Sequence, residues 1–218
     1  MTINALSELK YVCYPAYARQ GEGLALSLAE QKKLEKPIKL LTVCRLISRK
    51  RIDLLIRAVG RAKELGIDTQ LNIAGEGNLM GQLQKFANEL NVADNVTFMG
   101  RAPFEQMPQL YRDNDIFVMS NIHEGMSNAM LEAMASGLPI ITTPCEGAEE
   151  LIADNGIVVK HAQAEEFAKA IKKLANDQQA YNQMSIAARK QAEKFSWKNV
   201  ASQYLDCYSR ILNPTLGS

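Results

Sequence analysis

The chain has 218 residues, of which 47% are apolar, and its 25 lysine and arginine residues nearly balance its 24 aspartate and glutamate residues. This length and composition are enough to bury the core of one large globular domain. Because the formal charge is only +1, the chain lacks the overall basic field on which non-specific nucleic-acid binding relies, and we expect no nucleic-acid partner.

The cysteines lie far apart and form no C-x-x-C pair, which argues against a zinc site and against a disulfide framework. They are Cys13, Cys44, Cys145 and Cys207. No apolar run approaches the roughly 20 residues of a membrane span, and the N-terminus lacks a charged region followed by an apolar one. We therefore expect free thiols and a cytoplasmic location.

Residues 1–37 show no clear periodicity. The run KYVCYPAY could form a short strand and LALSLAEQKKLEK a short helix, and Pro37 ends the segment. We interpret residues 1–37 as a leader or linker, for which the remnant of an interdomain region is one explanation.

From residue 38 on, short apolar runs alternate with amphipathic stretches, which is typical of repeated β-α units. The pattern predicts an α/β domain over residues 38–195, with a Rossmann-like parallel sheet and helices on both faces. The stretch 51–66 carries an apolar stripe and ends at Gly66, a residue suited to a helix C-terminus. Beyond Lys160 three helical stretches form a tail, and Ser196 is placed to cap the last of them, a closing helix within residues 196–218. The expected strands are IKLLTV, TQLNIAG, NVTFMG, DIFVMS, LPIITT and GIVVK.

Ligands of open parallel sheets bind beyond the carboxyl ends of the strands, so the loops at those ends are the informative positions. In the loop CRLISRKR, which follows IKLLTV, Arg45 and Lys50 could hold a diphosphate, the first as a fork and the second as a point charge. A solvated charged loop is the simpler alternative. The run RKR at residues 49–51 could also contact an anionic membrane surface, although three charges are weak evidence.

A second loop, AGEGNLMG, follows TQLNIA. Its glycines Gly75, Gly77 and Gly81 have a spacing similar to that of a dinucleotide-binding turn, which would make the chain a fragment of a nicotinamide-dependent oxidoreductase. The turn does not follow the first strand of its unit, and the expected acidic residue is missing from the next strand end. A plain tight turn before a helix is the alternative.

The third loop contains HEGMSNAMLEAMASGLPII, with Glu124 in the loop and Glu132 about one turn inside the following helix. Ser127 or Asn128 can cap this helix, and the N–H groups of residues 125–129 form a site for an anion at its N-terminus. An offset of eight residues spans about 12 Å if wholly helical, which is the scale of a nucleotide-sugar. Carboxylates accept hydrogen bonds from vicinal hydroxyls, so one glutamate suits a ribose and the other a hexose.

The stretch EGMSNAMLEAMASGLPII resembles the E-x7-E motif of glycosyltransferase family 4, the retaining sugar-nucleotide enzymes of GT-B fold. Five further segments resemble family motifs in the same order over residues 39–212: LLTVCRLISRKR, LNIAGEG, VTFMGRAP, EGAEELI and FSWKNVASQYLDCYSRIL. Cys44 and Arg51 stand where the family commonly has glycine, which leaves both cations in place but alters the geometry of their loop.

The resemblance implies a role for each matched position. Arg45 and Lys50 would bind the donor diphosphate, Glu124 the transferred sugar and Glu132 the ribose. The remaining donor-binding positions it implies are Gly75, Gly77, Gly125, Met126, Ser127, Asn128, Arg101, Ala102 and Pro103, the last three near the base. The donor would be a UDP- or GDP-sugar, with no cofactor, metal or protein nucleophile.

The resemblance also implies a second, N-terminal domain for the acceptor, for which the residues ahead of Lys39 are too few. We therefore expect this chain to be the donor-binding half of a polysaccharide-assembling enzyme, inactive or weak alone and peripheral at most to the inner membrane face. A non-catalytic nucleotide-sugar-binding module is the alternative.

Overall fold

A computed structural model describes the backbone of residues 32–212 and the side chains of these residues except Trp197 and Lys198. The short strand and short helix considered for residues 10–36 fall largely outside this range, and residues 32–36 form neither helix nor strand. The first strand begins at Ile38, directly after the segment interpreted as a leader.

The sheet has six strands in the spatial order β3-β2-β1-β4-β5-β6, and every neighbouring pair is parallel. Each strand lies within the apolar run predicted to form it, so the predicted Rossmann-like parallel sheet is confirmed. The strands are β1 (Ile38–Val43), β2 (Thr69–Ala74), β3 (Val96–Gly100), β4 (Ile116–Met119), β5 (Ile140–Thr142) and β6 (Gly156–Val158).

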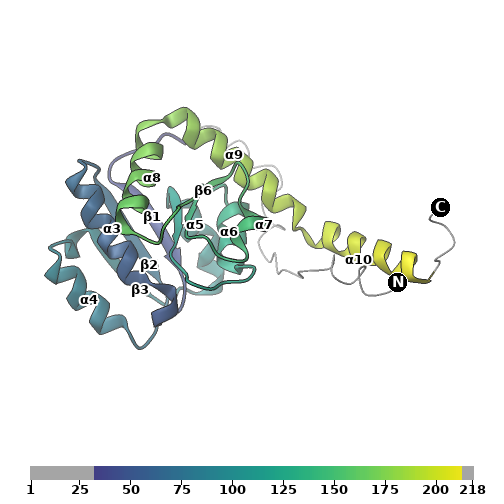
Figure 1. The fold of residues 1–218 in the computed structure, drawn as a ribbon, viewed down its shortest axis with the longest axis horizontal. Helices are drawn as coiled ribbons and strands as arrows, with labels where there is room; N and C mark the ends of the chain where they lie inside the picture. Colours follow the sequence, from purple (N-terminus) through teal and green to yellow (C-terminus); the bar gives the residue numbers. More distant parts are fainter. Residues whose placement is uncertain (1–31, 213–218) are drawn as a thin grey trace.

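Helices cover both faces of the sheet. Successive side chains of a strand point to opposite faces, so apolar strand residues need a covering layer on each side. Leu40 of β1 and Val118 of β4 belong to one hydrophobic core, whereas their neighbours Leu41 and Phe117 belong to the other. The first core is covered by α3 (Ile52–Glu64), α4 (Met80–Glu89) and α8 (Ala164–Asn176), as Figure 1 shows. The second core is covered by α5 (Met107–Arg112), α6 (Asn128–Ala135), α7 (Ala148–Leu151) and α9 (Gln178–Lys194).

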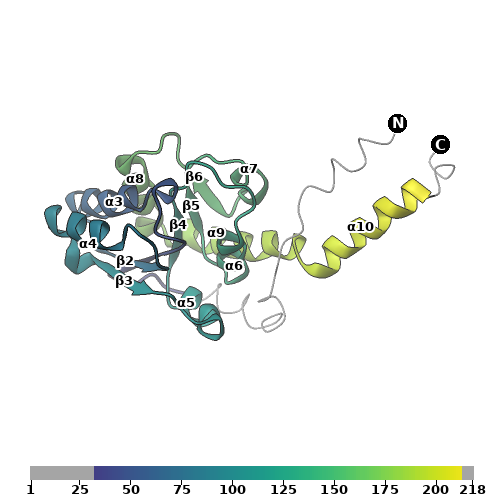
Figure 2. The same ribbon diagram turned by 90° about the horizontal axis from the view of Figure 1, so that it is seen from below.

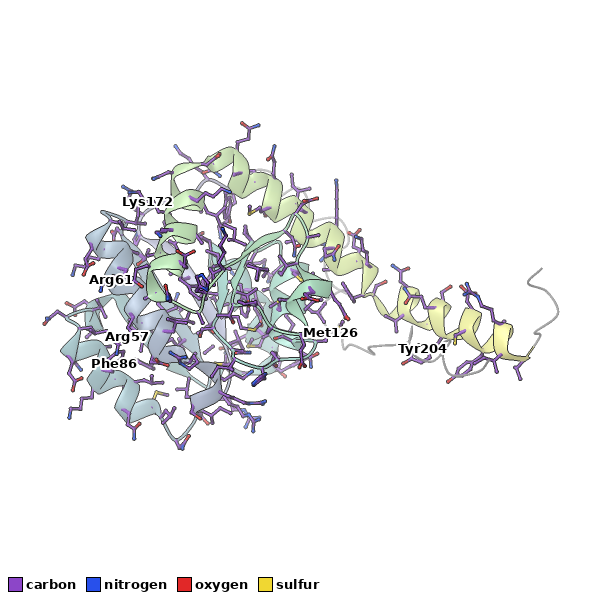
Figure 3. All side chains as sticks on the ribbon, in the orientation of Figure 1. Arg57, Arg61, Phe86, Met126, Lys172 and Tyr204 are labelled. Atoms are coloured by element: carbon purple, nitrogen blue, oxygen red, sulfur yellow. The ribbon has the colours of Figure 1, made fainter. Side chains whose placement is uncertain are left out.

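Helix α3 lies within the stretch 51–66 that the sequence predicts to be helical. Its apolar stripe is buried, and the chain leaves the helix at Gly66 with a φ of 75°, a left-handed conformation that glycine adopts without a steric penalty. On the outer side of α3, the Arg57 guanidinium lies 4.4 Å from the centre of the Phe86 ring of α4 (Figure 3). The helix therefore separates the core of the sheet from a charged surface.

The helical tail ends in α10 (Trp197–Leu212), which extends away from the sheet and its covering helices in both Figure 1 and Figure 2. The Ser196 hydroxyl accepts a hydrogen bond from the Asn199 N–H at 3.4 Å, as predicted for a cap of this helix. Val200 near its start is buried, whereas Leu205 and Leu212 are 66% and 78% exposed.

Strands β1 and β4 lie side by side although they are far apart in the sequence, with Leu40 opposite Ile116. The chain runs outward from β1 through β2 to β3, then returns to the other side of β1 to form β4, so the direction of strand addition reverses between β1 and β4. Open α/β sheets bind ligands at such a reversal, beyond the carboxyl ends of the strands. The fold therefore brings the loops after β1 and β4 together at the expected place for a site.

Candidate functional site

The loops after β1 and β4 meet through an ion pair. Lys50 is at the end of a short 3-10 helix (Ser48–Lys50), and its Nζ lies 2.5 Å from Oε2 of Glu124. Both side chains are largely buried, at 10% and 19% exposure. The Ser120 hydroxyl lies 2.8 Å from the carbonyl oxygens of both Lys50 and Arg51, which fixes the two loops to each other. Two predicted site residues are thus in direct contact.

The same carboxylate oxygen of Glu124 has a second donor. Nδ2 of the buried Asn121 lies 2.8 Å from Oε2, and the backbone carbonyl of Asn121 accepts a hydrogen bond from the Thr143 hydroxyl at 2.7 Å. Among the described residues, every side-chain hydrogen bond to Glu124 ends on Oε2. The second carboxylate oxygen, Oε1, therefore keeps its acceptor capacity.

The loop after β5 holds the backbone of the Glu124 loop in place. The Gly147 N–H donates to the carbonyl of Glu124 at 3.0 Å. A Cβ atom at position 147 would lie 2.1 Å from the carbonyl oxygen of Gly125, closer than real Cβ atoms come to any neighbour. Position 147 thus requires glycine for the two loops to pack at this distance.

Helix α6 begins where the sequence predicts. Ser127 is the N-cap, and its hydroxyl accepts the N–H of Met130 at 3.4 Å. Gly125 and Asn128 are exposed at this end of the helix, and Met126 is half-buried against the second core. Figure 3 shows Met126 on the α6 side of the sheet, opposite Arg57 and Phe86. Partial positive charge at this helix N-terminus favours an anion beside the Lys50–Glu124 pair.

Glu132 lies in a cavity of about 490 Å³ that the loop after β3 helps to form. The Tyr111 hydroxyl of α5 donates to Oε2 of Glu132 at 2.8 Å. Burial raises the pKa of Glu132 above its ordinary value, and the hydrogen bond from Tyr111 opposes that rise. Glu132 is thus not a solvated helix residue. The lining residues are Arg101, Ala102, Pro103, Phe104, Met107 and Glu132, which brings the loop predicted to lie near a base to the glutamate predicted to bind a ribose.

The cations of the loop after β1 differ in their exposure and in their ion pairs. Arg45 is exposed, whereas Arg51 is paired with Asp53 at 3.2 Å. The run at residues 49–51 therefore does not form one cationic patch, because Lys50 is buried and only Arg49 is exposed and without an ion pair among the described residues.

Gly75 and Gly77 pack against the loop after β1. Added Cβ atoms would lie 1.8 Å from the carbonyl oxygen of Cys44 and 2.2 Å from that of Leu46, respectively. Gly75 has a φ of 141°, and the Leu46 N–H donates to the Glu76 carbonyl at 2.8 Å. Backbone packing against the Arg45 loop therefore accounts for both glycines, whereas Gly81 has open space around it. A direct contact of Gly75 or Gly77 with a nucleotide-sugar stays a prediction.

Sequence reasoning missed Asn121, Tyr111 and Gly147 as parts of the site. Asn121 was detectable in principle, because it lies two positions after the end of β4 and precedes Glu124 by three residues. Tyr111 and Gly147 reach the site only through the packing of α5 and of the loop after β5, which no local pattern encodes.

The sheet order defines a Rossmann-like α/β protein, and the cation–carboxylate pair at the strand reversal and the cavity at Glu132 form a candidate ligand site at the carboxyl edge of its sheet. Residues 26–191 match the family described as Glycosyl transferases group 1, and the chain belongs to this family.

The chain is 32% identical over 199 residues to an uncharacterised glycosyltransferase of Methanocaldococcus jannaschii, covering 86% of this chain and 50% of that protein. It is 29% identical over 185 residues to the GDP-mannose-dependent alpha-(1-6)-phosphatidylinositol monomannoside mannosyltransferase of Mycolicibacterium smegmatis, covering 80% of this chain and 48% of that protein. The crystal structure of Anabaena HepE in complex with UDP superposes with a TM-score of 0.73 at 21% identity, over 85% of this chain and 52% of that one. The chain thus spans about half the length of these relatives.

The helices between residues 32 and 212 include none with the length and apolar character that a membrane span requires. The same residues contain no group of three or more histidine, cysteine, aspartate or glutamate side chains placed to hold a metal ion.

Proposed function

We propose that this chain binds a UDP- or GDP-sugar as the donor half of a retaining, family-4-like glycosyltransferase, which transfers a hexose to a glycan or a lipid-linked acceptor in the cytoplasm. The observation that carries the proposal is the division of the carboxyl edge of the sheet into two parts. One part holds a buried cation–carboxylate pair, and the other a cavity with a single carboxylate. A nucleotide-sugar has the matching parts, with an anionic centre between a sugar and a nucleoside.

In this proposal the diphosphate lies at the N-terminus of α6, beside Lys50 and the exposed Arg45. Both cations and the N–H groups of residues 126–128 oppose the negative charge that develops on the diphosphate as its bond to the sugar breaks. Glu124 accepts a hydrogen bond from a sugar hydroxyl, and Glu132 accepts hydrogen bonds from the ribose hydroxyls. The base then lies towards residues 101–103.

Transfer with retention would have the acceptor hydroxyl attack C1 of the sugar from the face that the diphosphate leaves. The C1–O bond to the phosphate breaks as the new C1–O bond forms, and the hydroxyl proton passes to the leaving phosphate. The chain's residues then act by positioning and by charge stabilisation, not as nucleophiles.

The acceptor would be bound by a further domain, which would correspond to the half of the relatives that this chain does not match. On that basis we expect this 218-residue chain to bind donor and to transfer sugar weakly or not at all. Robust transfer by this chain alone to a defined acceptor would contradict that part of the proposal.

Thermal unfolding with UDP, GDP, ADP, NAD and the corresponding nucleotide-sugars tests the proposal. A ligand at 100 times its Kd stabilises a protein by about 2.7 kcal/mol, which is readily measured at this chain length. One nucleoside diphosphate should raise the Tm, and both Arg45→Ala and Glu132→Ala should reduce that shift to about half or less, as expected for a tenfold or greater loss of affinity. Stabilisation by NAD alone would instead favour the oxidoreductase alternative, and no shift with any of these ligands would overturn donor binding.

A further inference from the structure

Asn121 is a buried amide in direct contact with the sugar end of the candidate site. It is only 2% exposed and lies two positions after the end of strand β4, next to Ser120, which fixes the loops after β1 and β4 to each other. Its backbone carbonyl accepts the hydroxyl proton of Thr143, so its main chain is held from the β5 side as well. Asn121 therefore has little freedom to move relative to the sheet.

The side chain of Asn121 is only half satisfied. Nδ2 donates to Oε2 of Glu124 at 2.8 Å, and a carboxylate, which only accepts, requires this orientation of the amide. Oδ1 is consequently left buried, and it is the one buried side-chain oxygen or nitrogen of the described residues that lacks a hydrogen-bond partner. A buried acceptor without a partner costs stability, and folded proteins retain such groups mainly where they serve another purpose.

That purpose is visible at Glu124. Lys50 of the loop after β1 and Asn121 of the loop after β4 both donate to Oε2, and neither donates to Oε1. Two donors on one oxygen fix the plane and direction of the carboxylate more tightly than the ion pair alone, since an ammonium group is a point charge without directional preference.

We propose that Asn121 is a positioning residue that holds the Glu124 carboxylate by Oε2 and reserves Oε1 for a hydroxyl of the donor sugar. The inference rests on the proposed function, because it assigns Glu124 to the sugar. Asn121 itself touches neither sugar nor phosphate, so its effect passes entirely through Glu124.

Calorimetric titration of this chain with a nucleoside diphosphate and with its sugar conjugate separates this role from a general structural one. The Kd of the diphosphate divided by the Kd of its sugar conjugate measures what the sugar adds to binding. We call this quotient the sugar ratio. Asn121→Ala should weaken the nucleotide-sugar about tenfold, the scale of one hydrogen bond to a charged group, and change the Kd of the diphosphate less than threefold.

The double variant Asn121→Ala/Glu124→Ala provides the decisive comparison. If Asn121 acts through Glu124, the double variant binds the nucleotide-sugar no more weakly than Glu124→Ala alone. Losses that multiply, or a sugar ratio that survives in Asn121→Ala, would overturn the positioning role while leaving donor binding intact. Absence of binding by the unsubstituted chain would overturn donor binding and this inference with it.

Two further variants guard against misfolding and against nonspecific damage. Asn121→Asp keeps the shape of the side chain but replaces the donor with an acceptor beside Glu124, and it should also lose the sugar ratio. Asn155→Ala is the matched control, because Asn155 is equally buried but its side chain bonds only to the backbone of Ala153 and Leu151, at the turn between α7 and β6. It should lower the Tm and keep the sugar ratio of the unsubstituted chain.

Discussion

The two glutamates of the candidate site share their chemistry but have opposite surroundings. Glu124 is held by a cation and an amide, whereas Glu132 is half-buried in a cavity, and Tyr111 donates to its carboxylate. The first glutamate is paired with the ammonium group of Lys50, whereas burial raises the pKa of the second above its ordinary value. The comparison teaches that one glutamate is held in place before any ligand arrives, while the hydrogen bond from Tyr111 offsets only part of the desolvation cost of the other.

The largest effect is expected from breaking the ion pair. Lys50→Met keeps the apolar stem of the side chain but leaves the Glu124 carboxylate with Asn121 alone, which should destabilise the fold by about 3 kcal/mol. Urea unfolding of Lys50→Met and of Lys50→Met/Glu124→Gln measures it. The double variant should regain most of the stability without regaining diphosphate binding. A loss below about 1 kcal/mol in the single variant would mean that the pair contributes little.

The second effect tests the loop that supports Glu124. In Gly147→Ala the new methyl group meets the Gly125 carbonyl, so the two loops must separate and the affinity for donor should fall at least tenfold. Gly156→Ala is the control, because its Cβ would lie 2.5 Å from the Ile140 carbonyl in the sheet, away from the site. Overpacking should cost both variants about 1–3 kcal/mol, but only the first should lose affinity in calorimetric titration. Equal affinities in the two variants would mean that the loop after β5 does not shape the donor site.

The third effect contrasts an exposed cation with the buried one. Arg45→Ala should weaken diphosphate binding about tenfold, as expected for the loss of one charge-assisted contact. Its free energy of unfolding should change by less than about 0.5 kcal/mol, because Arg45 is exposed. Arg49→Ala, another exposed cation of the same loop, is the control and should leave the Kd nearly unchanged. Equal losses of affinity in the two variants would indicate a diffuse field instead of a specific contact.

The smallest effect concerns the pH dependence at Glu132. Because its pKa is raised in the folded chain, the folded state binds the proton more tightly than the unfolded state, and stability falls as the pH rises through the raised pKa. Glu132→Gln removes this dependence, so its Tm should exceed that of the unsubstituted chain at pH 8 and approach it at pH 5. Each kcal/mol corresponds to about 2–4 °C at this size. A Tm difference that shrinks towards high pH would contradict the direction of the pKa shift.

Much of this fold could be predicted from the sequence, because local patterns determine its elements. Strand β1 coincides with IKLLTV, and α6 runs from its Ser127 cap towards Gly137, whose φ is 75°. Apolar runs of strand length and capping residues act over a few positions, so they can be read without tertiary information.

The contacts within the site could be predicted only in part. Lys50 and Glu124 were both singled out, but their pairing over 74 positions of sequence depends on the adjacency of β1 and β4. The glycines Gly75 and Gly77 predict either a plain tight turn or a turn near a ligand, and their tight spacing against Cys44 and Leu46 appears only when β1 and β2 are aligned. Long-range packing thus decides which residues of a recognised loop face one another.

The most direct test of the two-ended site is calorimetric titration of Glu124→Ala and Glu132→Ala with a nucleoside diphosphate and its sugar conjugate. We predict that Glu132→Ala weakens both ligands by about tenfold or more, because both carry the ribose. Glu124→Ala should weaken only the sugar conjugate. Loss of diphosphate binding in Glu124→Ala together with unchanged binding in Glu132→Ala would contradict the assignment of the two ends.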